Sequence, residues 1–223
     1  MSASLYVAAA LGVGAYLAGT FPTAAIVCRR YGIDPTVAGS GNPGASNVLR
    51  LAGARAGATV LIVDVAKGAL PALAAGRLVG DEAALVAGAL AVVGHCFPIG
   101  RRLRGGKGVA TAGGLLLAVE PWLALAAALV WAGIARGVRR ASVASLAAVV
   151  GTLVAMVALR RPPVEVGVFA AVVAIVVARH RVNLAQLARG EERTLEAGPA
   201  VAPASEANGQ RVGREDGDAR PRG

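Results

Sequence analysis

Apolar segments of membrane-spanning length recur along this chain and restrict what it can fold into. Each is long enough to form a helix that crosses all or part of the roughly 30 Å of hydrocarbon in a bilayer. Because 56% of the residues are hydrophobic and only 16% are charged, an ordinary soluble domain is excluded. We predict an all-α, polytopic integral membrane protein with about seven transmembrane helices. The segments cover residues 4–28, 57–79, 82–100, 106–119, 121–135, 142–159 and 164–178.

Two of these segments, 106–119 and 121–135, are short for an upright span. They meet at Glu120 and Pro121, a pair that interrupts the apolar sequence. They form either two short tilted helices or a re-entrant hairpin, so five spans plus a re-entrant pair is the alternative count. Both versions return the chain to the same side of the membrane.

Arginines at the ends of the apolar segments indicate which loops face the cytoplasm. Arg29 and Arg30 directly follow the first segment, which places that end in the cytoplasm and the N-terminus outside. Arg160 and Arg161 lie on the outer side in this topology, and they go against the positive-inside rule. The polar clusters all lie on the cytoplasmic side: 29–56, 64–68, 94–108 and 179–192.

The end of the chain differs in composition from the rest. From about residue 193 it contains Ala, Gly, Pro and mixed charge with almost no large apolar residue, so it cannot bury enough surface to fold. We predict one membrane-embedded domain over residues 1–192 and a disordered cytoplasmic tail over residues 193–223.

Residues 94–114, GHCFPIGRRLRGGKGVATAGG, combine four cations with several glycines. Glycines allow backbone N–H groups to approach an oxyanion at the start of a helix, which we predict over 109–119. The segment is not a nucleotide P-loop, because that pattern needs Gly at 101 and Ser or Thr at 108. Topology alone gives another reason for the charge, since cytoplasmic loops are commonly positive.

Lysine usage points to the same segment. Only two of the 23 cations are lysines, and both Lys67 and Lys107 lie beside glycine. Lys67 follows Asp64 by three residues, on the same face of an apolar helix. Charged groups inside a span are candidates for function, although this pair can also neutralise itself. We treat Lys67 as a candidate substrate-binding residue.

Several other classes of site are not expected. The net charge of +10 lies largely in short loops, and aromatic residues are only 4%, so nucleic acid is not an expected partner. Cys28 and Cys96 give no disulfide framework, and with His95 and His180 they lack the spacing of metal ligands. We expect neither a metal nor a cofactor.

Four motifs, in this order, carry a resemblance to a known family: SGNPGASNVLR (40–50), DVAKG, the 94–114 segment and RHRVNLAQLARGEE. Over about residues 4–192 the chain resembles the bacterial acyl-phosphate:glycerol-3-phosphate acyltransferases of the PlsY type. The resemblance implies a seven-helix enzyme of the bacterial plasma membrane with a cytoplasmic active site. It implies transfer of a fatty acyl group from acyl phosphate to the 1-hydroxyl of sn-glycerol 3-phosphate, giving lysophosphatidate and phosphate.

The resemblance also implies roles for single residues. Catalytic roles fall on Ser40, Arg50, His180 and Asn183. Substrate-binding roles fall on Asn42, Asn47, Gly105, Gly106, Lys107 and Gly108. Structural roles fall on His95, at the corner of its motif, and on Glu192.

The proton of the attacking hydroxyl has three candidate acceptors. His180 has an ordinary pKa near 6.5 that suits proton transfer, and a substrate phosphate or Ser40 is an alternative. Ser40 has no base among its sequence neighbours, so we favour a hydrogen-bonding role for it over a nucleophilic one. Two other functions remain as alternatives, an organophosphate carrier built on broken helices and an inactive membrane scaffold.

Overall fold

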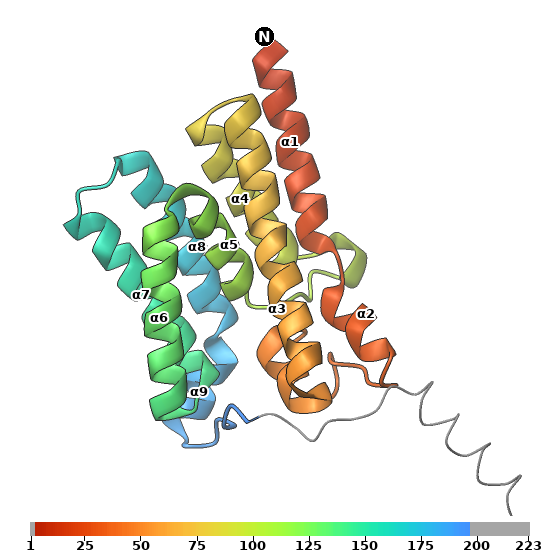
Figure 1. Cartoon of the computed structure of the whole chain (residues 1–223). Helices are drawn as coiled ribbons and strands as arrows, with labels where there is room; N and C mark the ends of the chain where they lie inside the picture. The colour runs from red at the N-terminus through yellow and green to blue at the C-terminus, as the bar shows by residue number, and fades with distance from the viewer. Residues whose placement is uncertain (1–2, 197–223) are drawn as a thin grey trace, which may run out of the picture. The chain divides into compact units, whose positions relative to one another are not determined.

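The computed structural model describes residues 3–196, and all of their regular secondary structure is helical (Figure 1). Residues 197–223, most of the predicted disordered tail, lie outside the described residues. The described part forms two compact units, and each is presented by itself. Unit 1 contains the residues up to Pro22 together with Leu61–Glu196, and unit 2 contains Thr23–Val60.

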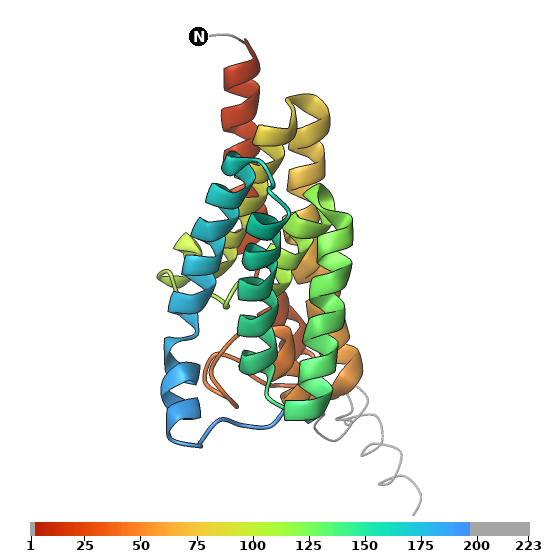
Figure 2. The same cartoon turned by 90° about the vertical axis from the view of Figure 1, so that its left-hand side faces the viewer.

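Unit 1 is a bundle of helices in which successive long helices run in opposite directions (Figures 1 and 2). The turns after α3, α5 and α7 therefore lie at one end. The loop between α4 and α5, which contains the short 3-10 helix η1 (Ile99–Arg101), lies part-way along the bundle. The helices are α1 (Ala3–Thr20), the later part of α3 (Ala45–Leu78), α4 (Asp81–Cys96), α5 (Val109–Val119), α6 (Pro121–Val138), α7 (Ala141–Ala158), α8 (Pro163–Arg179) and α9 (Arg181–Ala188).

Glycines let helices of this bundle approach to backbone contact. A Cβ at Gly19 of α1 would overlap the carbonyl of Ala91, and a Cβ at Gly94 of α4 would overlap the carbonyl of Tyr16. Small residues at helix interfaces are typical of membrane proteins, where close van der Waals packing replaces the hydrophobic effect. Helices α1 and α4 are therefore packed side by side.

The same reciprocal arrangement joins α3 to α5. Cβ atoms at Gly68 and Gly114 would each overlap a backbone carbonyl of the other helix. Around this contact α4, α5, α7 and α8 share an apolar core that includes Val92, Leu115 and Phe169. This packing fixes where the loop between α4 and α5 begins and ends.

Helix lengths agree with an integral membrane protein. Five described segments are long and apolar enough to cross a bilayer, and α8 with α9, bent by 54°, is a sixth if counted as one span. Each of the seven predicted apolar segments contains a helix, and α5 and α6 are separate helices that contact each other. The orientation of the N-terminus stays a prediction.

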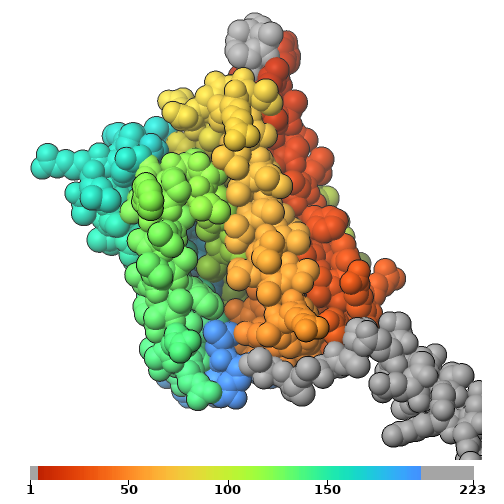
Figure 3. Space-filling view, in the orientation of Figure 1, coloured from red at the N-terminus to blue at the C-terminus, as the bar shows by residue number. Residues whose placement is uncertain are grey.

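The outer face of α6 is apolar and open. Trp122 at its start is 80% exposed, and Leu125 and Leu129 continue the same exposed surface. Figure 3 shows α6 along one side of the bundle of unit 1. Such side chains suit contact with lipid hydrocarbon.

Arg161, which opposes the positive-inside rule, is paired with two carboxylates. It contacts Glu120 between α5 and α6, and its Nε lies 3.2 Å from Glu165 in the first turn of α8. The two acidic residues neutralise this arginine. For Arg161, the exception in the predicted topology therefore has a structural explanation.

The structure differs from the sequence prediction in two places. The first apolar segment is interrupted at Phe21 and Pro22, and a separate helix α2 (Thr23–Arg29) follows. The polar segment 29–56 is helical in its later part, because α3 begins at Ala45 and continues through a kink at Gly53 (φ 83°). Glycine tolerates this backbone conformation, so the helix resumes directly after it.

Candidate functional site

The glycine-rich loop of unit 1 is hydrogen-bonded to the end of α4. The N–H of Gly105 donates to the Cys96 carbonyl at 3.2 Å, and the N–H of Gly106 donates to the His95 carbonyl at 3.1 Å. A Cβ at Gly106 would overlap His95 Nε2, and the imidazole lies against this glycine. Glycine is required at 106 because no side chain fits there.

Arg179, the last residue of α8, holds the same loop from the other side. Its Nε donates to the Gly106 carbonyl at 3.0 Å and its Nη2 to the Gly105 carbonyl at 2.6 Å. Its guanidinium carbon lies 5.5 Å from the centre of the Phe97 ring, within cation–π range. Sequence reasoning missed this residue, although it opens the RHRVN motif directly before His180.

The loop leads into the N-terminus of α5. Gly108 is the N-cap residue with a left-handed conformation (φ 85°), and Val109 begins the helix. The first backbone N–H groups of a helix have no partner within the helix, and they favour an anion. Lys107 adds a cation directly before them. This arrangement suits a phosphate group.

Lys67 lies in a buried ion pair connected to His95. Its Nζ is 2.6 Å from Asp64 Oδ1 and donates to the Phe21 carbonyl at 2.7 Å. That carbonyl is available because α1 ends before Pro22, which cannot continue the helical hydrogen bonding. Asp64 Oδ1 is also 3.9 Å from His95 Nδ1. The cluster thus joins α1, α3 and α4 behind the glycine-rich loop, and a substrate contact of Lys67 stays a prediction.

His180 follows Arg179 at the junction of α8 and α9, where it is 1% exposed. Its Nδ1 lies 2.7 Å from the Val176 carbonyl. A carbonyl oxygen only accepts, so the proton of the neutral imidazole is assigned to Nδ1 and Nε2 is the basic nitrogen. This tautomer suits acceptance of a proton at Nε2.

Asn183 is oriented by a buried carboxylate. Its Nδ2 donates to Glu192 Oε1 at 2.8 Å, and Ser142 at the start of α7 donates to Glu192 Oε2 at 2.6 Å. The amide oxygen of Asn183 is thereby directed away from Glu192. Glu192 connects α9 to α7, which suits the structural role predicted for it, and Ser142 is a partner that the sequence did not indicate.

Replacement of Glu192 by Gln should lower the stability of the fold. The NH₂ group of the new amide would face either the NH₂ group of Asn183 or the hydroxyl of Ser142, which both donate to Glu192. We expect a loss of about 1.5–3 kcal/mol, the value of a hydrogen bond to a charged group. The loss is detected as a lower midpoint of thermal unfolding in detergent. Glu191→Gln is the matched control, because Glu191 is exposed and pairs only with Arg189 on the surface. Equal midpoints for both variants would contradict the prediction.

In unit 2, Asn47 organises the loop that carries Ser40. Its Oδ1 accepts from the Ser40 N–H at 2.9 Å, and its Nδ2 donates to the carbonyls of Pro35 and Ala38, each at 3.1 Å. Asn47 is 1% exposed, whereas Ser40 is exposed. The predicted substrate-binding role of Asn47 stays a prediction, and the observed contacts are with the loop.

The other predicted residues of unit 2 lie close in sequence to this loop. Asn42 is half-buried within it, and Arg50 is half-buried on α3, three residues after Asn47 and thus on the same helix face. The loop starts with a turn in which Asp34 Oδ1 accepts from the N–H and the hydroxyl of Thr36. These hydrogen bonds lower the pKa of the Asp34 carboxyl.

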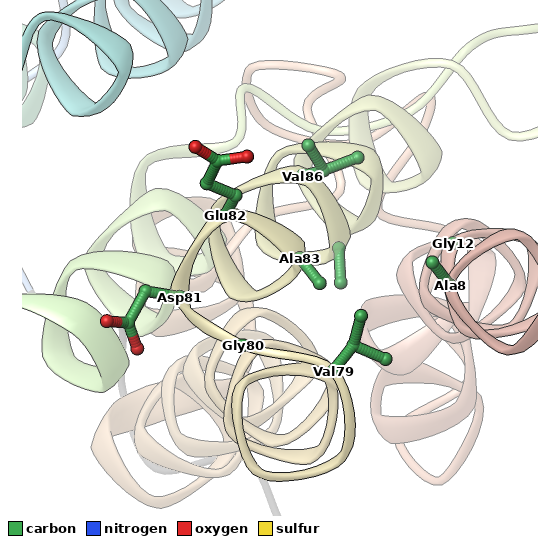
Figure 4. A pocket seen from close by; sticks show the side chains of 9 residues that line it. Ala8, Gly12, Val79, Gly80, Asp81, Glu82, Ala83 and Val86 are labelled. Carbon is green, nitrogen blue, oxygen red and sulfur yellow. The ribbon is translucent and has the colours of Figure 1, made fainter. Parts of the chain in front are cut away.

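A cavity of about 450 Å³ lies at the start of α4, at the opposite end of this helix from the glycine-rich loop (Figure 4). It is lined by Gly80 and Asp81 at the turn between α3 and α4, and by Ala8 and Gly12 of α1. The glycine-rich loop, in contrast, packs on the last turn of α4. None of the predicted site residues lines this cavity.

Cys28 and Cys96 are both buried, and both are free thiols. Among residues 3–196, no group of three or more His, Cys, Asp or Glu side chains is placed to hold a metal ion.

Comparisons with known proteins agree with these features. The profile of the family described as "Glycerol-3-phosphate acyltransferase" matches residues 9–190. A glycerol-3-phosphate acyltransferase of Thioalkalivibrio sulfidiphilus is 44% identical, over 84% of this chain and 94% of its own. One of Myxococcus xanthus is 45% identical, over 80% of this chain and 94% of its own.

Solved structures match as well. The glycerol 3-phosphate form of PlsY, an integral membrane glycerol 3-phosphate acyltransferase, has a TM-score of 0.82 at 34% identity and covers 85% of this chain and 96% of its own. The lysophosphatidic acid form of PlsY has a TM-score of 0.79 at 35% identity, over 84% of this chain and 95% of its own. The all-α membrane fold predicted from the sequence is confirmed.

Proposed function

Since this chain belongs to the glycerol-3-phosphate acyltransferase family, we propose that it transfers a fatty acyl group from acyl phosphate to the 1-hydroxyl of sn-glycerol 3-phosphate. The products are lysophosphatidate and phosphate. The observation that carries the proposal is the glycine-rich loop, which is held between α4 and α8 and leads with Lys107 into the N-terminus of α5. This site suits the phosphate of the acceptor.

The reaction needs little covalent assistance, because acyl phosphate is already activated. The oxygen of the acceptor hydroxyl attacks the carbonyl carbon, the hydroxyl proton leaves to a base, and the bond to the phosphate oxygen breaks with its electron pair. The enzyme must bring two anions together and stabilise the charge that develops on the carbonyl and the leaving phosphate. Cations and backbone N–H groups provide this stabilisation.

His180 Nε2 is the protein group best suited to accept the proton. Its Nδ1 is engaged with the Val176 carbonyl, so Nε2 carries the available lone pair. A phosphate oxygen of a substrate remains the alternative acceptor. The hydrogen bond from Asn183 Nδ2 to Glu192 orients the Asn183 amide, so its oxygen is directed away from Glu192. Ser40 and Arg50 are the other two proposed catalytic residues.

We further place the enzyme in the bacterial plasma membrane, with the active site on the cytoplasmic side and the acyl chain of the donor entering from the lipid. The positions of Arg29 and Arg30 after the first apolar segment support this orientation. Residues 1–192 form the acyltransferase domain of the proposal, and 193–223 form its cytoplasmic tail. The expected partners are acyl phosphate, glycerol 3-phosphate and the lipid bilayer.

Purified protein given palmitoyl phosphate and glycerol 3-phosphate should release phosphate and form lysophosphatidate. Ser40→Ala should lower turnover at least about 100-fold, the cost of losing one hydrogen-bond donor to a transition state. Thr59→Ala is the control, because it also removes a hydroxyl of unit 2, but one that bonds only to the Arg55 carbonyl of its own helix.

Two outcomes would contradict these claims separately. Folded wild-type protein that releases no phosphate would refute the proposed reaction, and uptake of glycerol 3-phosphate into liposomes without product would indicate a carrier. Full activity in Ser40→Ala would refute only the role of Ser40.

A further inference from the structure

Arg179 makes two of the contacts that hold the glycine-rich loop of unit 1, although it is not among the site residues predicted from the sequence. Its Nε and Nη2 donate to the carbonyls of two successive residues, Gly106 at 3.0 Å and Gly105 at 2.6 Å. We propose that Arg179 is a positioning residue that holds this loop in its phosphate-binding conformation. The inference rests on the proposed function, in which the loop binds the phosphate of glycerol 3-phosphate.

The loop is fixed from two sides. The N–H groups of Gly105 and Gly106 donate to carbonyls at the end of α4, and their carbonyls accept from Arg179 of α8. A peptide bond is planar and trans, so the N–H of Lys107 points away from the Gly106 carbonyl and therefore away from Arg179. Arg179 thus sets the direction of the amide that precedes the N-terminus of α5.

The same bonds reduce repulsion of an anion. Carbonyl oxygens carry partial negative charge, and two of them turned toward a phosphate would oppose its binding. Hydrogen bonds to a guanidinium keep the carbonyls of Gly105 and Gly106 on the side of Arg179. In the proposed function, the backbone N–H groups in the first turn of α5 face the ligand, as in other glycine-rich anion sites.

The geometry calls for arginine in particular. The planar guanidinium offers donors in a fixed fork, and two of them match two adjacent carbonyl oxygens. The guanidinium carbon also lies over the Phe97 ring, 5.5 Å from its centre. Lysine would bring the same charge but not the planar fork of donors, so charge and geometry can be separated by experiment.

Arg179 also connects the two parts of the proposed reaction in unit 1. It precedes His180 directly, so the backbone that places the proposed proton acceptor is attached to the side chain that holds the acceptor loop.

The test compares Arg179→Lys and Arg179→Gln with the matched pair Arg181→Lys and Arg181→Gln. Arg181 is exposed on α9, two residues away. Steady-state phosphate release is measured against glycerol 3-phosphate at saturating palmitoyl phosphate. Both Arg179 variants should raise the KM for glycerol 3-phosphate about tenfold or more, which corresponds to about 1.4 kcal/mol, with kcat within about threefold of wild type. Both Arg181 variants should match the wild type.

Other results would overturn the proposal. If Arg179→Lys behaves as wild type while Arg179→Gln is impaired, only the charge matters and the positioning role is wrong. A fall in kcat without a rise in KM, or unchanged kinetics in both variants, would also refute it. Inactive wild-type protein would instead refute the proposed function, so the two failures are distinguishable.

A second variant covers the case in which Arg179 variants do not fold. Phe97→Leu removes the ring under the guanidinium and keeps both donors and an apolar side chain. It should raise the KM for glycerol 3-phosphate about threefold, in the same direction as the Arg179 variants, because the cation–π contact that helps to place the guanidinium is lost. A KM equal to that of wild type would count against the proposal.

Discussion

Replacement of Asn47 by Asp should abolish activity and destabilise the protein, although the two side chains have nearly the same shape. The amide of Asn47 donates to the carbonyls of Pro35 and Ala38. A carboxylate would instead face these two oxygens with a negative charge at a position that is 1% exposed. An uncompensated buried charge costs about 3–5 kcal/mol, and the loop that carries Ser40 would lose its anchor.

We expect turnover to fall at least about 100-fold and the thermal unfolding midpoint in detergent to drop, with Asn47→Ala less affected because it adds no charge. Asp34→Asn is the control. It exchanges the same two residue types in the same loop, at an exposed site where Oδ1 still accepts from Thr36. An Asp variant of residue 47 as stable and active as wild type would show that the loop does not depend on this amide.

Gly106→Ala should chiefly raise the KM for glycerol 3-phosphate, by about tenfold or more. The added Cβ would overlap Nε2 of the buried His95 ring, so either the loop or the ring must move. The loop also carries the two carbonyls bound by Arg179, and its displacement would misplace the N–H groups proposed to hold the phosphate. Initial rates of phosphate release over a range of glycerol 3-phosphate concentrations measure the effect.

Gly113→Ala is the matched control, because a Cβ at this exposed position of α5 meets nothing within 4 Å. It should leave the kinetics unchanged and slightly favour the helix. The double variant Gly106→Ala with His95→Ala separates steric overlap from other causes. If overlap is the cause, the double variant should have a lower KM than the product of the two single effects predicts. Strict additivity would mean that the overlap with His95 is not what impairs binding.

The helices were predictable from sequence because hydrophobicity over 15–25 residues is a strong local signal in a membrane protein. Breaks inside the apolar segments were harder to place. Pro22 divides the first segment into α1 and α2, and Gly53 kinks α3 without ending it. A glycine or proline signals irregular backbone, but packing with the rest of the chain decides whether the helix stops or continues.

The candidate site was predictable only in part. The motif residues were singled out because their residue types recur in a known pattern, and the structure shows that the glycine-rich loop packs against His95. The contacts of Arg179 with that loop join residues 73 and 74 positions apart, and Ser142 reaches Glu192 over 50 positions. No local pattern encodes such pairs. A substrate contact of Asn47 stays a prediction, and its observed partners are backbone groups of its own loop.

Helix α5 has 11 residues and is therefore only about 16 Å long at 1.5 Å per residue, about half the thickness of the hydrocarbon. The glycine-rich loop at its start is recessed along the bundle as a result (Figure 2). In the proposed reaction a water-soluble acceptor thus binds part-way along the bundle rather than at its end. Keeping the acyl chain of the donor in hydrocarbon avoids a cost of about 0.8 kcal/mol for each methylene that would otherwise be exposed to water. In that reaction the short α5 brings the acceptor toward the donor, so the lipid tail need not be lifted out of the bilayer.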